Sequence, residues 1–156
     1  MKFKQKVLSY AFIGTLIAIG ISPIAKAELT GLNFGLLGGA SLNSTASTSS
    51  YAWGGTANYR LPFMNLQVGA EYLNIGESPQ LTGKLDYYLI YSFYVGALAG
   101  VKLTDPSTVI WGAESAISYD IGSGFELGPK VEINIGNVAG TSSVLMNVLA
   151  LLRYNI

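Results

Sequence analysis

The feature that most constrains the fold is a period-two alternation of apolar and polar residues, which runs through almost the whole chain after residue 30. Segments of roughly ten residues alternate in this way, separated by stretches rich in Gly, Ser, Thr, Asn, Asp and Pro. Successive side chains of a β-strand point to opposite faces, so this period indicates strands. The pattern predicts eight strands, at residues 31–41, 51–60, 65–74, 83–92, 94–103, 108–119, 125–135 and 144–156.

The two faces of these strands differ in charge. One face is apolar and carries no charged residue on any predicted strand. The other face carries all five basic residues that follow residue 27, six of the nine acids including Asp120 and Glu126, and many glycines that suit a crowded interior. Because unpaired buried charges are costly, we expect an inward-facing ion-pair network. Its predicted members are Arg60, Glu71, Lys84, Asp86, Lys102, Glu114, Lys130, Glu132 and Arg153.

Aromatic residues of the apolar face gather toward the two ends of the predicted strands. One group is Tyr51, Trp53, Tyr72 and Trp111, and the other is Tyr59, Tyr91, Tyr119, Phe125 and Tyr154. Two aromatic belts around an aliphatic band are typical of the two membrane–water interfaces. A sheet in hydrocarbon must close to pair its backbone groups. The sequence therefore predicts an all-β fold, an up-and-down antiparallel eight-stranded transmembrane β-barrel, narrow enough to be plugged by its own side chains.

The N-terminal segment has the form of a secretory signal peptide. Lys2, Lys4 and Lys6 precede an apolar run, and Ala25-Lys26-Ala27 supplies an A-x-A cleavage pattern. We expect residues 1–27 to be removed, with Ala25 and Ala27 at the cleavage site, and residues 28–156 to form the barrel domain. The remaining 129 residues then carry five basic and nine acidic side chains, a net charge of −4.

Composition excludes several classes of function. The chain contains no Cys, so it has no disulfide framework, thiol nucleophile or thiolate metal site. It contains no His, which removes the usual general base, the Ser-His triad and most zinc sites. We expect no catalytic residues, cofactor or metal, and the charge gives no reason to expect nucleic acid.

The connections between the predicted strands fit an up-and-down topology. Residues 61–65 and 121–124 form short turns at one end, and 104–107 is a short connection at the other. Longer polar loops are expected at 42–50, 75–82 and 136–143, where surface recognition would occur; they lack the aromatic anchors of a strong adhesin. A tight turn is assumed near 92–94, and Pro129 requires a bulge or a gap in pairing because proline has no N–H.

Several segments carry a resemblance to a known family. They are 68–73 (VGAEYL), 94–100 (YVGALAG), 111–114 (WGAE), 118–129 (SYDIGSGFELGP) and the closing run Val148–Ile156. With the signal peptide, they resemble small eight-stranded outer-membrane β-barrel proteins of the OmpA/OmpX type, here expected without a periplasmic domain. The closing run resembles the family's C-terminal assembly signal, although members usually end in an aromatic residue and this chain ends in Ile156.

The resemblance implies location in the outer membrane of a Gram-negative-type bacterium, with a structural, adhesive or protective role. Its implied partners are outer-membrane lipid and, through Val148–Ile156, the outer-membrane assembly machinery; a surface partner is not identified. Three alternatives stay open: a secreted or periplasmic soluble barrel that binds an apolar ligand inside, a very narrow channel, and a barrel enzyme using a carboxylate pair such as Glu71 with Glu114.

Overall fold

A computed structural model of the chain describes residues 31–44, 46–62, 64–90, 92–138 and 141–156. The predicted signal peptide, with Ala25 and Ala27, lies outside the described residues, as does Tyr91 of the predicted aromatic belts. Within the described part, no helix is long and apolar enough to cross a membrane. The strands are β1 (Gly31–Asn43), β2 (Thr48–Arg60), β3 (Leu66–Ile75), β4 (Ser78–Ile90), β5 (Phe93–Lys102), β6 (Thr108–Ile117), β7 (Tyr119–Gly122), β8 (Phe125–Val138) and β9 (Thr141–Asn155).

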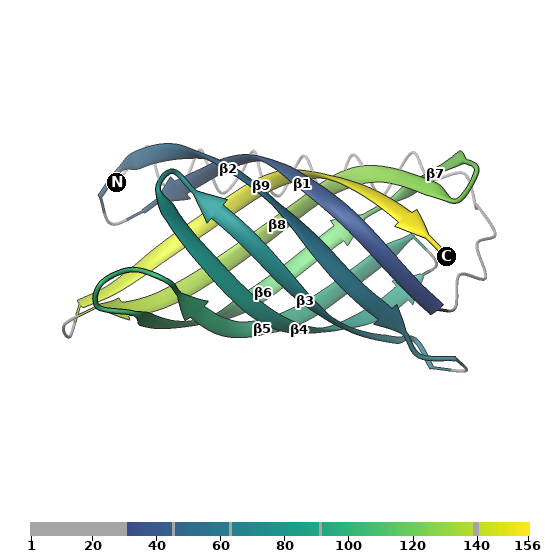
Figure 1. Ribbon diagram of the computed structural model, residues 1–156, viewed down its shortest axis with the longest axis horizontal. Helices are drawn as coiled ribbons and strands as arrows, with labels where there is room; N and C mark the ends of the chain where they lie inside the picture. The colour runs from purple at the N-terminus through teal and green to yellow at the C-terminus, as the bar shows by residue number, and fades with distance from the viewer. Residues whose placement is uncertain (1–30, 45, 63, 91, 139–140) are drawn as a thin grey trace.

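The strands form one closed antiparallel barrel (Figure 1). Each strand from β1 to β6 pairs with the next along the chain, β9 pairs with both β1 and β8, and a further pairing of β6 with β8 closes the ring. β6 and β7 are two parts of one strand of the barrel wall. The wall therefore has eight strands, here called staves, as the sequence predicts. Closure leaves no open sheet edge along the barrel wall.

The stagger of the strands fixes the width of the barrel. Following paired residues once around the wall leads from Asn33 to Asn43, ten residues further along β1. The path passes through Asn58, Gly69, Lys84, Leu98, Gly112, Asn134 and Leu145. With usual strand spacing and rise, this stagger gives a strand tilt of roughly 40° and a backbone diameter of about 16 Å. Side chains fill a lumen of this width.

The interruption between β6 and β7 coincides with Pro129 on the neighbouring strand. Ala116 pairs with Lys130, and Tyr119 pairs with Leu127 in the same register. The pairs that would lie between them, at Ile117 and Ser118, are missing from the ladder. Because Pro129 has no N–H to donate, the gap in pairing expected from the sequence is what the wall shows.

The connections predicted at 42–50, 75–82 and 136–143 are shorter than expected, and that prediction was wrong in extent. β1 continues to Asn43 and β2 begins at Thr48; β8 continues to Val138 and β9 begins at Thr141. Ser and Thr are common in loops, but both are compatible with strands where a hairpin extends. Between Ile75 and Ser78 the turn has two residues, and Gly76 with φ +60° suits the first position of such a hairpin.

The remaining connections agree with the sequence more closely. β5 ends at Lys102 and β6 begins at Thr108, which places the predicted 104–107 connection between them. β4 ends at Ile90 and β5 begins at Phe93, close to the assumed turn. We call the end with the connections after Asn43, Ile75, Lys102 and Val138 the loop end, and the end with Gly31 and Ile156 the terminal end.

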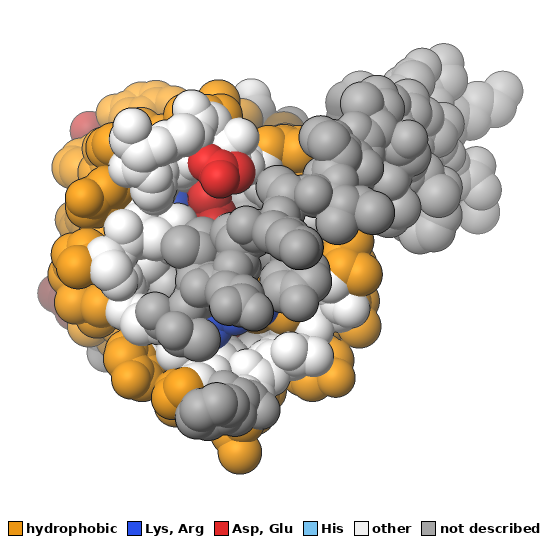
Figure 2. Space-filling model, turned by 90° about the vertical axis from the view of Figure 1, so that its right-hand side faces the viewer, with side chains coloured by type: hydrophobic (Ala, Val, Ile, Leu, Met, Phe, Trp, Pro, Cys, Tyr) orange, Lys and Arg blue, Asp and Glu red, His pale blue; other side chains and the backbone are white. Residues whose placement is uncertain are grey.

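Apolar side chains cover the outside of the barrel, whereas charged side chains lie inside. Leu36 is 67% exposed and Val109 is 69% exposed, while Lys130 and Glu132 are 0% exposed. Viewed from the terminal end, hydrophobic side chains surround the molecule and charged atoms are visible within the ring (Figure 2). Two residues differ in exposure from what their faces predict. Ile117 pairs with Phe93 on the outward parity but is buried beside the gap. Asp120 pairs with Glu126 on the inward parity but is exposed near the end of the barrel, where it accepts a hydrogen bond from the Gly122 N–H.

Candidate functional site: the polar lumen

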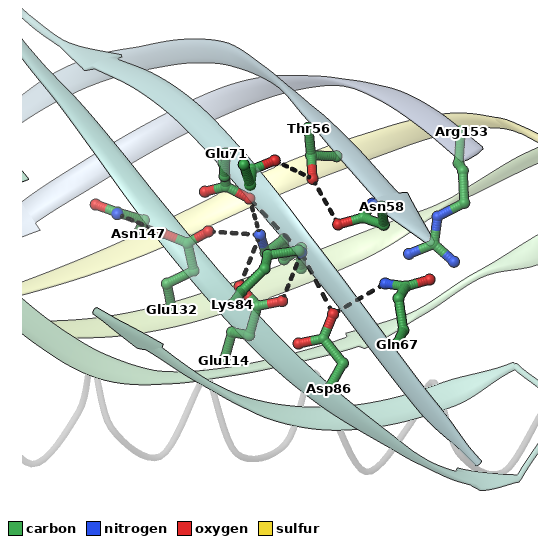
Figure 3. Close-up of polar contacts among 12 residues, drawn as sticks. Thr56, Asn58, Gln67, Glu71, Lys84, Asp86, Glu114, Glu132, Asn147 and Arg153 are labelled. Atoms are coloured by element: carbon green, nitrogen blue, oxygen red, sulfur yellow. Dashed lines mark hydrogen bonds and ion pairs between the residues drawn. The ribbon is translucent and has the colours of Figure 1, made fainter. Parts of the chain in front are cut away.

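The middle of the lumen holds six charged side chains, here called the central cluster. Its members are Glu71, Lys84, Asp86, Glu114, Lys130 and Glu132. They come from β3, β4, β6 and β8, and each points inward because it shares the inward parity of its strand. All six are buried. The cluster therefore joins four staves of the barrel through its interior (Figure 3).

The Lys130 ammonium group is surrounded by three carboxyl groups. Its Nζ lies 2.7 Å from Glu132 Oε1 and 2.9 Å from Glu114 Oε2, and it also contacts Glu71 Oε2. An ammonium group has three N–H donors. Lys130, on β8, thus meets Glu132 of its own strand and one acid each from β6 and β3, and it links β8 to these two strands through the lumen.

Lys84 bridges the other side of the cluster. Its Nζ lies 2.7 Å from Glu114 Oε1, 3.5 Å from Asp86 Oδ2 and 3.8 Å from Glu71 Oε2. Glu114 therefore lies between both lysines, with one carboxyl oxygen toward each. Charge-assisted contacts of this kind in a buried site are stronger than those between neutral groups.

A single glycine lets Asp86 and Glu114 approach each other across β5. Gly96 pairs with Asp86 on one side and with Glu114 on the other. A Cβ atom at Gly96 would collide with Asp86 Oδ1. The absence of a side chain at this inward position makes room for the two acids and for Lys84 to reach both.

Amide and hydroxyl groups extend the network toward the terminal end. Gln67 Nε2 donates to Asp86 Oδ2 at 2.9 Å, while Gln67 Oε1 accepts from Asn33 at 3.1 Å and from the Tyr88 hydroxyl at 3.0 Å. Asn58 donates to Asn33 at 2.9 Å. These bonds satisfy buried polar atoms, each of which is costly to leave unpaired.

A second group of charges lies near the terminal end. Arg153 Nη1 donates to the Tyr88 hydroxyl at 2.8 Å and to Glu126 Oε2 at 3.3 Å. The guanidinium carbon of Arg153 lies 5.4 Å from the Tyr94 ring centroid, and that of Arg60 lies 3.8 Å from the Tyr88 ring centroid. Cation–π contacts of this kind are favourable where the cation is desolvated.

An apolar cluster fills part of the remaining interior. It consists of Leu37, Ala52, Leu73, Ile75, Leu149 and Leu151, all buried. These residues lie on β1, β2, β3 and β9. The central cluster is therefore bordered by hydrocarbon on the side of the wall where the first and last strands meet.

Three carboxyl groups of the central cluster have the spacing of a cation site. One oxygen each from Glu71, Glu114 and Glu132 lie within 4.8 Å of one another. The Lys130 ammonium group contacts all three acids. Because a lysine already provides the positive charge that a bound metal would bring, the arrangement does not suit a metal ion.

The structure brings seven of the nine predicted network residues into ion pairs. Six form the central cluster, and Arg153 pairs with Glu126, which the sequence placed on the inner face but not in the network. The other two lie elsewhere. Arg60 stacks over Tyr88, and Lys102 is half-buried at the loop end of β5.

Sequence reasoning missed the two inward-facing tyrosines, Tyr88 and Tyr94. Both are buried, and their ring centroids lie 5.2 Å apart. The parity of β4 could have identified Tyr88, because it follows Lys84 and Asp86 at intervals of two residues. Tyr94 shares the parity of Lys102 on β5. Because tyrosine counts as apolar in a hydropathy pattern, neither residue was assigned to the polar face.

The described aromatic-belt residues lie at the two ends of the barrel. At the loop end, Tyr51, Trp53, Tyr72 and Trp111 are exposed, and the Trp53 and Tyr72 rings meet edge to face at 6.4 Å. At the terminal end, Tyr59, Phe125 and Tyr154 are exposed, Tyr119 is half-buried, and the Phe125 and Tyr154 ring centroids lie 4.7 Å apart. Both groups are positioned to meet a membrane–water interface.

Comparison with known proteins agrees with this architecture. No protein-family model matches the sequence, and no curated protein matches it. The crystal structure of Neisserial surface protein A (NspA) is similar with a TM-score of 0.64 at 13% identity, covering 80% of this chain and 96% of that chain. A de novo designed transmembrane β-barrel is similar with a TM-score of 0.52 at 16% identity, covering 85% of this chain and 100% of that chain. At these identities the likeness concerns the fold.

The closed wall, the apolar exterior and these likenesses define the class of protein as a small eight-stranded transmembrane β-barrel. The predicted fold class is confirmed, and so is the resemblance to small outer-membrane barrels at the level of the fold. The predicted location, the outer membrane of a Gram-negative-type bacterium, agrees with this class.

Proposed function

We propose that the protein is an integral outer-membrane β-barrel with a plugged lumen and a structural role, without catalytic activity. Its exposed aliphatic side chains hold it in the bilayer, and its aromatic belts set its depth. The central cluster cross-links the staves from within and blocks the lumen.

The observation that carries this proposal is the contact of the Lys130 ammonium group with acids from β3, β6 and β8. A contact that reaches three staves of a barrel about 16 Å wide leaves little room for ions to pass beside it. The fully buried lysine and its acids would also have to separate, at high cost, before the lumen could open.

Two measurements test the proposal. Isolated outer membranes are analysed by detergent electrophoresis with and without boiling, and a compact barrel is expected to migrate faster only in the unboiled sample. The purified protein is then inserted into planar lipid bilayers, where no discrete conductance steps are expected. A soluble periplasmic protein without a heat-dependent shift, or regular channel openings, would contradict the proposal.

The other two function classes fit the geometry less well. A soluble barrel with an apolar ligand inside needs the apolar face inward, whereas this face is exposed. An enzyme that used Glu71 with Glu114 would need free carboxyl groups, but both acids contact lysines.

A narrow channel is the second candidate function, because several buried polar atoms along the lumen have no protein hydrogen-bond partner and would suit internal water.

The proposed partners follow from the exterior and from the last strand. Outer-membrane lipid would cover the aliphatic band. The assembly machinery would recognise Val148–Ile156, which comprises the end of β9 and the last residue; the outward side chains Val148, Leu152 and Tyr154 are exposed. Nucleic acid is not a proposed partner, and the short connections at the loop end offer a small surface for recognition.

A further inference from the structure

The central cluster contains more acids than bases. Four carboxyl groups and two ammonium groups are buried together, none more than 6% exposed. If every acid were ionised, the cluster would carry two excess negative charges. An uncompensated charge away from water is costly enough that buried groups change their protonation state instead.

The remaining basic residues do not neutralise this excess. Arg153 is paired with Glu126, while Arg60 and Lys102 are half-buried toward opposite ends of the barrel. The side chains that the other staves direct toward the cluster are uncharged under ordinary conditions. They are Leu37 on β1, Thr56 and Asn58 on β2, Tyr94 on β5, and Asn147 and Leu149 on β9.

The contacts of the carboxyl oxygens identify where the excess lies. Both oxygens of Glu114 contact a lysine. Glu132 Oε1 contacts Lys130, and its Oε2 accepts from Asn147 at 2.9 Å. Among the described residues, Glu71 Oε1 and Asp86 Oδ1 have neither a hydrogen bond nor an ion pair, although both side chains are buried. The central cluster thus has two excess negative charges and two carboxyl oxygens without an interaction partner.

We propose that the central cluster is a two-proton binding site, in which Glu71 and Asp86 are neutral acids while Glu114 and Glu132 remain ionised. Two carboxylates then face two ammonium groups, and the cluster has no net charge. Each neutral acid shares an ammonium group with an ionised one: Glu71 shares Lys130 with Glu132, and Asp86 shares Lys84 with Glu114. Acids that are held this close share a proton more readily than both ionise.

This inference deepens the proposed function, since it makes the plug electrically neutral at physiological pH. It also predicts what would open the plug. Loss of the two protons at alkaline pH would leave two uncompensated charges in the lumen, and water would enter to solvate them.

Infrared spectroscopy of the protein in phosphatidylcholine vesicles tests the inference. An ordinary solvated carboxyl group is ionised at pH 7, so the carbonyl stretch of protonated carboxylic acids reports neutral buried acids. The wild-type protein should show this band at pH 7, shifted in D₂O, and lose it at alkaline pH. A wild-type spectrum without the band at pH 7 would overturn the proposal, whether or not any variant assembles.

Variants then assign the band. Glu71→Gln and Asp86→Asn each keep the shape of a neutral acid, so each should fold and remove about half of the band, and together they should remove it. Glu126→Gln, which changes the acid paired with Arg153 outside the cluster, is the matched control and should leave the band unchanged. A band that survives the double variant would place the protons elsewhere and overturn the assignment.

The experiment separates this inference from the proposed function. The band reports protonation in the folded barrel, whereas planar-bilayer recording reports conduction. Channel openings with the band present would contradict the plug alone. A barrel that shows neither channel openings nor the infrared band would contradict the two-proton site alone. So would a barrel that retains a stoichiometric metal cation in elemental analysis.

Discussion

Lys84 Nζ on β4 lies 2.7 Å from Glu114 Oε1 on β6, although β5 separates these two strands in the wall. The ion pair therefore crosses the lumen side of a neighbouring stave. It adds to the backbone ladders a contact that depends on the closed shape of the barrel.

Removal of Lys84 should destabilise the barrel strongly. Lys84→Met leaves Glu114 and Asp86 with less positive charge nearby, and breaking one side of a buried pair costs about 3–5 kcal/mol. The double variant Lys84→Met/Glu114→Gln removes both partners and should recover much of this loss. Urea unfolding in lipid vesicles, followed by tryptophan fluorescence, measures the free energy of unfolding.

Lys102 provides the control for this comparison. It is half-buried at the loop end of β5, so Lys102→Met should change the free energy of unfolding by no more than about 0.5 kcal/mol. Equal losses in Lys84→Met and Lys102→Met would show that the central cluster contributes no special stability.

Gly96→Ala should disrupt the cluster without changing any charge. Its added methyl group would collide with Asp86 Oδ1, and overpacking of this kind costs about 1–3 kcal/mol. Gly83 is the matched control, because it lies on the outward face of β4 where a Cβ would meet only the Ala99 carbonyl oxygen at 3.9 Å. Gly83→Ala should be neutral or slightly stabilising in the same unfolding assay. A reversed order of stability would contradict the inward packing.

The sequence predicts the barrel well because alternation and charge give the same answer on every strand. A charge-free face and a glycine-rich polar face are enough to assign the outside and the inside. The ion pairs between residues far apart in the sequence were harder to predict. Residues that meet in the lumen, such as Glu71 and Lys130, are far apart along the chain, and only the register of all the strands together decides which inward residues face each other.

The errors of the sequence prediction also have physical causes. Ser and Thr occur in both turns and strand ends, so the extent of the loop-end hairpins could not be derived from composition. Asp120 keeps the parity of the inner face, because it pairs with Glu126, but it lies beside the turn at Gly122 with φ +99°, so its carboxyl group is exposed and accepts from the Gly122 N–H. Local backbone geometry of this kind is not encoded in an alternating pattern.

Replacement of Pro129 should restore the strand pairing that is missing at Ile117 and Ser118. Pro129→Val supplies an N–H opposite Ile117 and should join β6 and β7 into one continuous strand, with a gain of about 1 kcal/mol. In Pro129→Val, the new amide of residue 129 should donate to the Ile117 carbonyl oxygen and exchange its hydrogen slowly. Pro62→Ala, in the exposed turn after β2, is the control and should leave the free energy of unfolding unchanged. Fast hydrogen exchange at the amide of residue 129 in Pro129→Val would mean that the proline does not cause the gap.

The last residue offers a test of assembly. Ile156 is 72% exposed at the terminal end, and its N–H donates to the Leu32 carbonyl oxygen at 3.0 Å, which ties the chain end to the wall. Members of the outer-membrane barrel family that this chain resembles usually end in an aromatic residue. Aromatic side chains also anchor strands at the membrane–water interface. Ile156→Phe should therefore raise the fraction of newly made protein that reaches the heat-modifiable form. Ile121→Phe adds the same ring to another exposed position at the same end and controls for hydrophobicity. An equal rise in both variants would show that interfacial anchoring, and not recognition of the last residue, limits assembly.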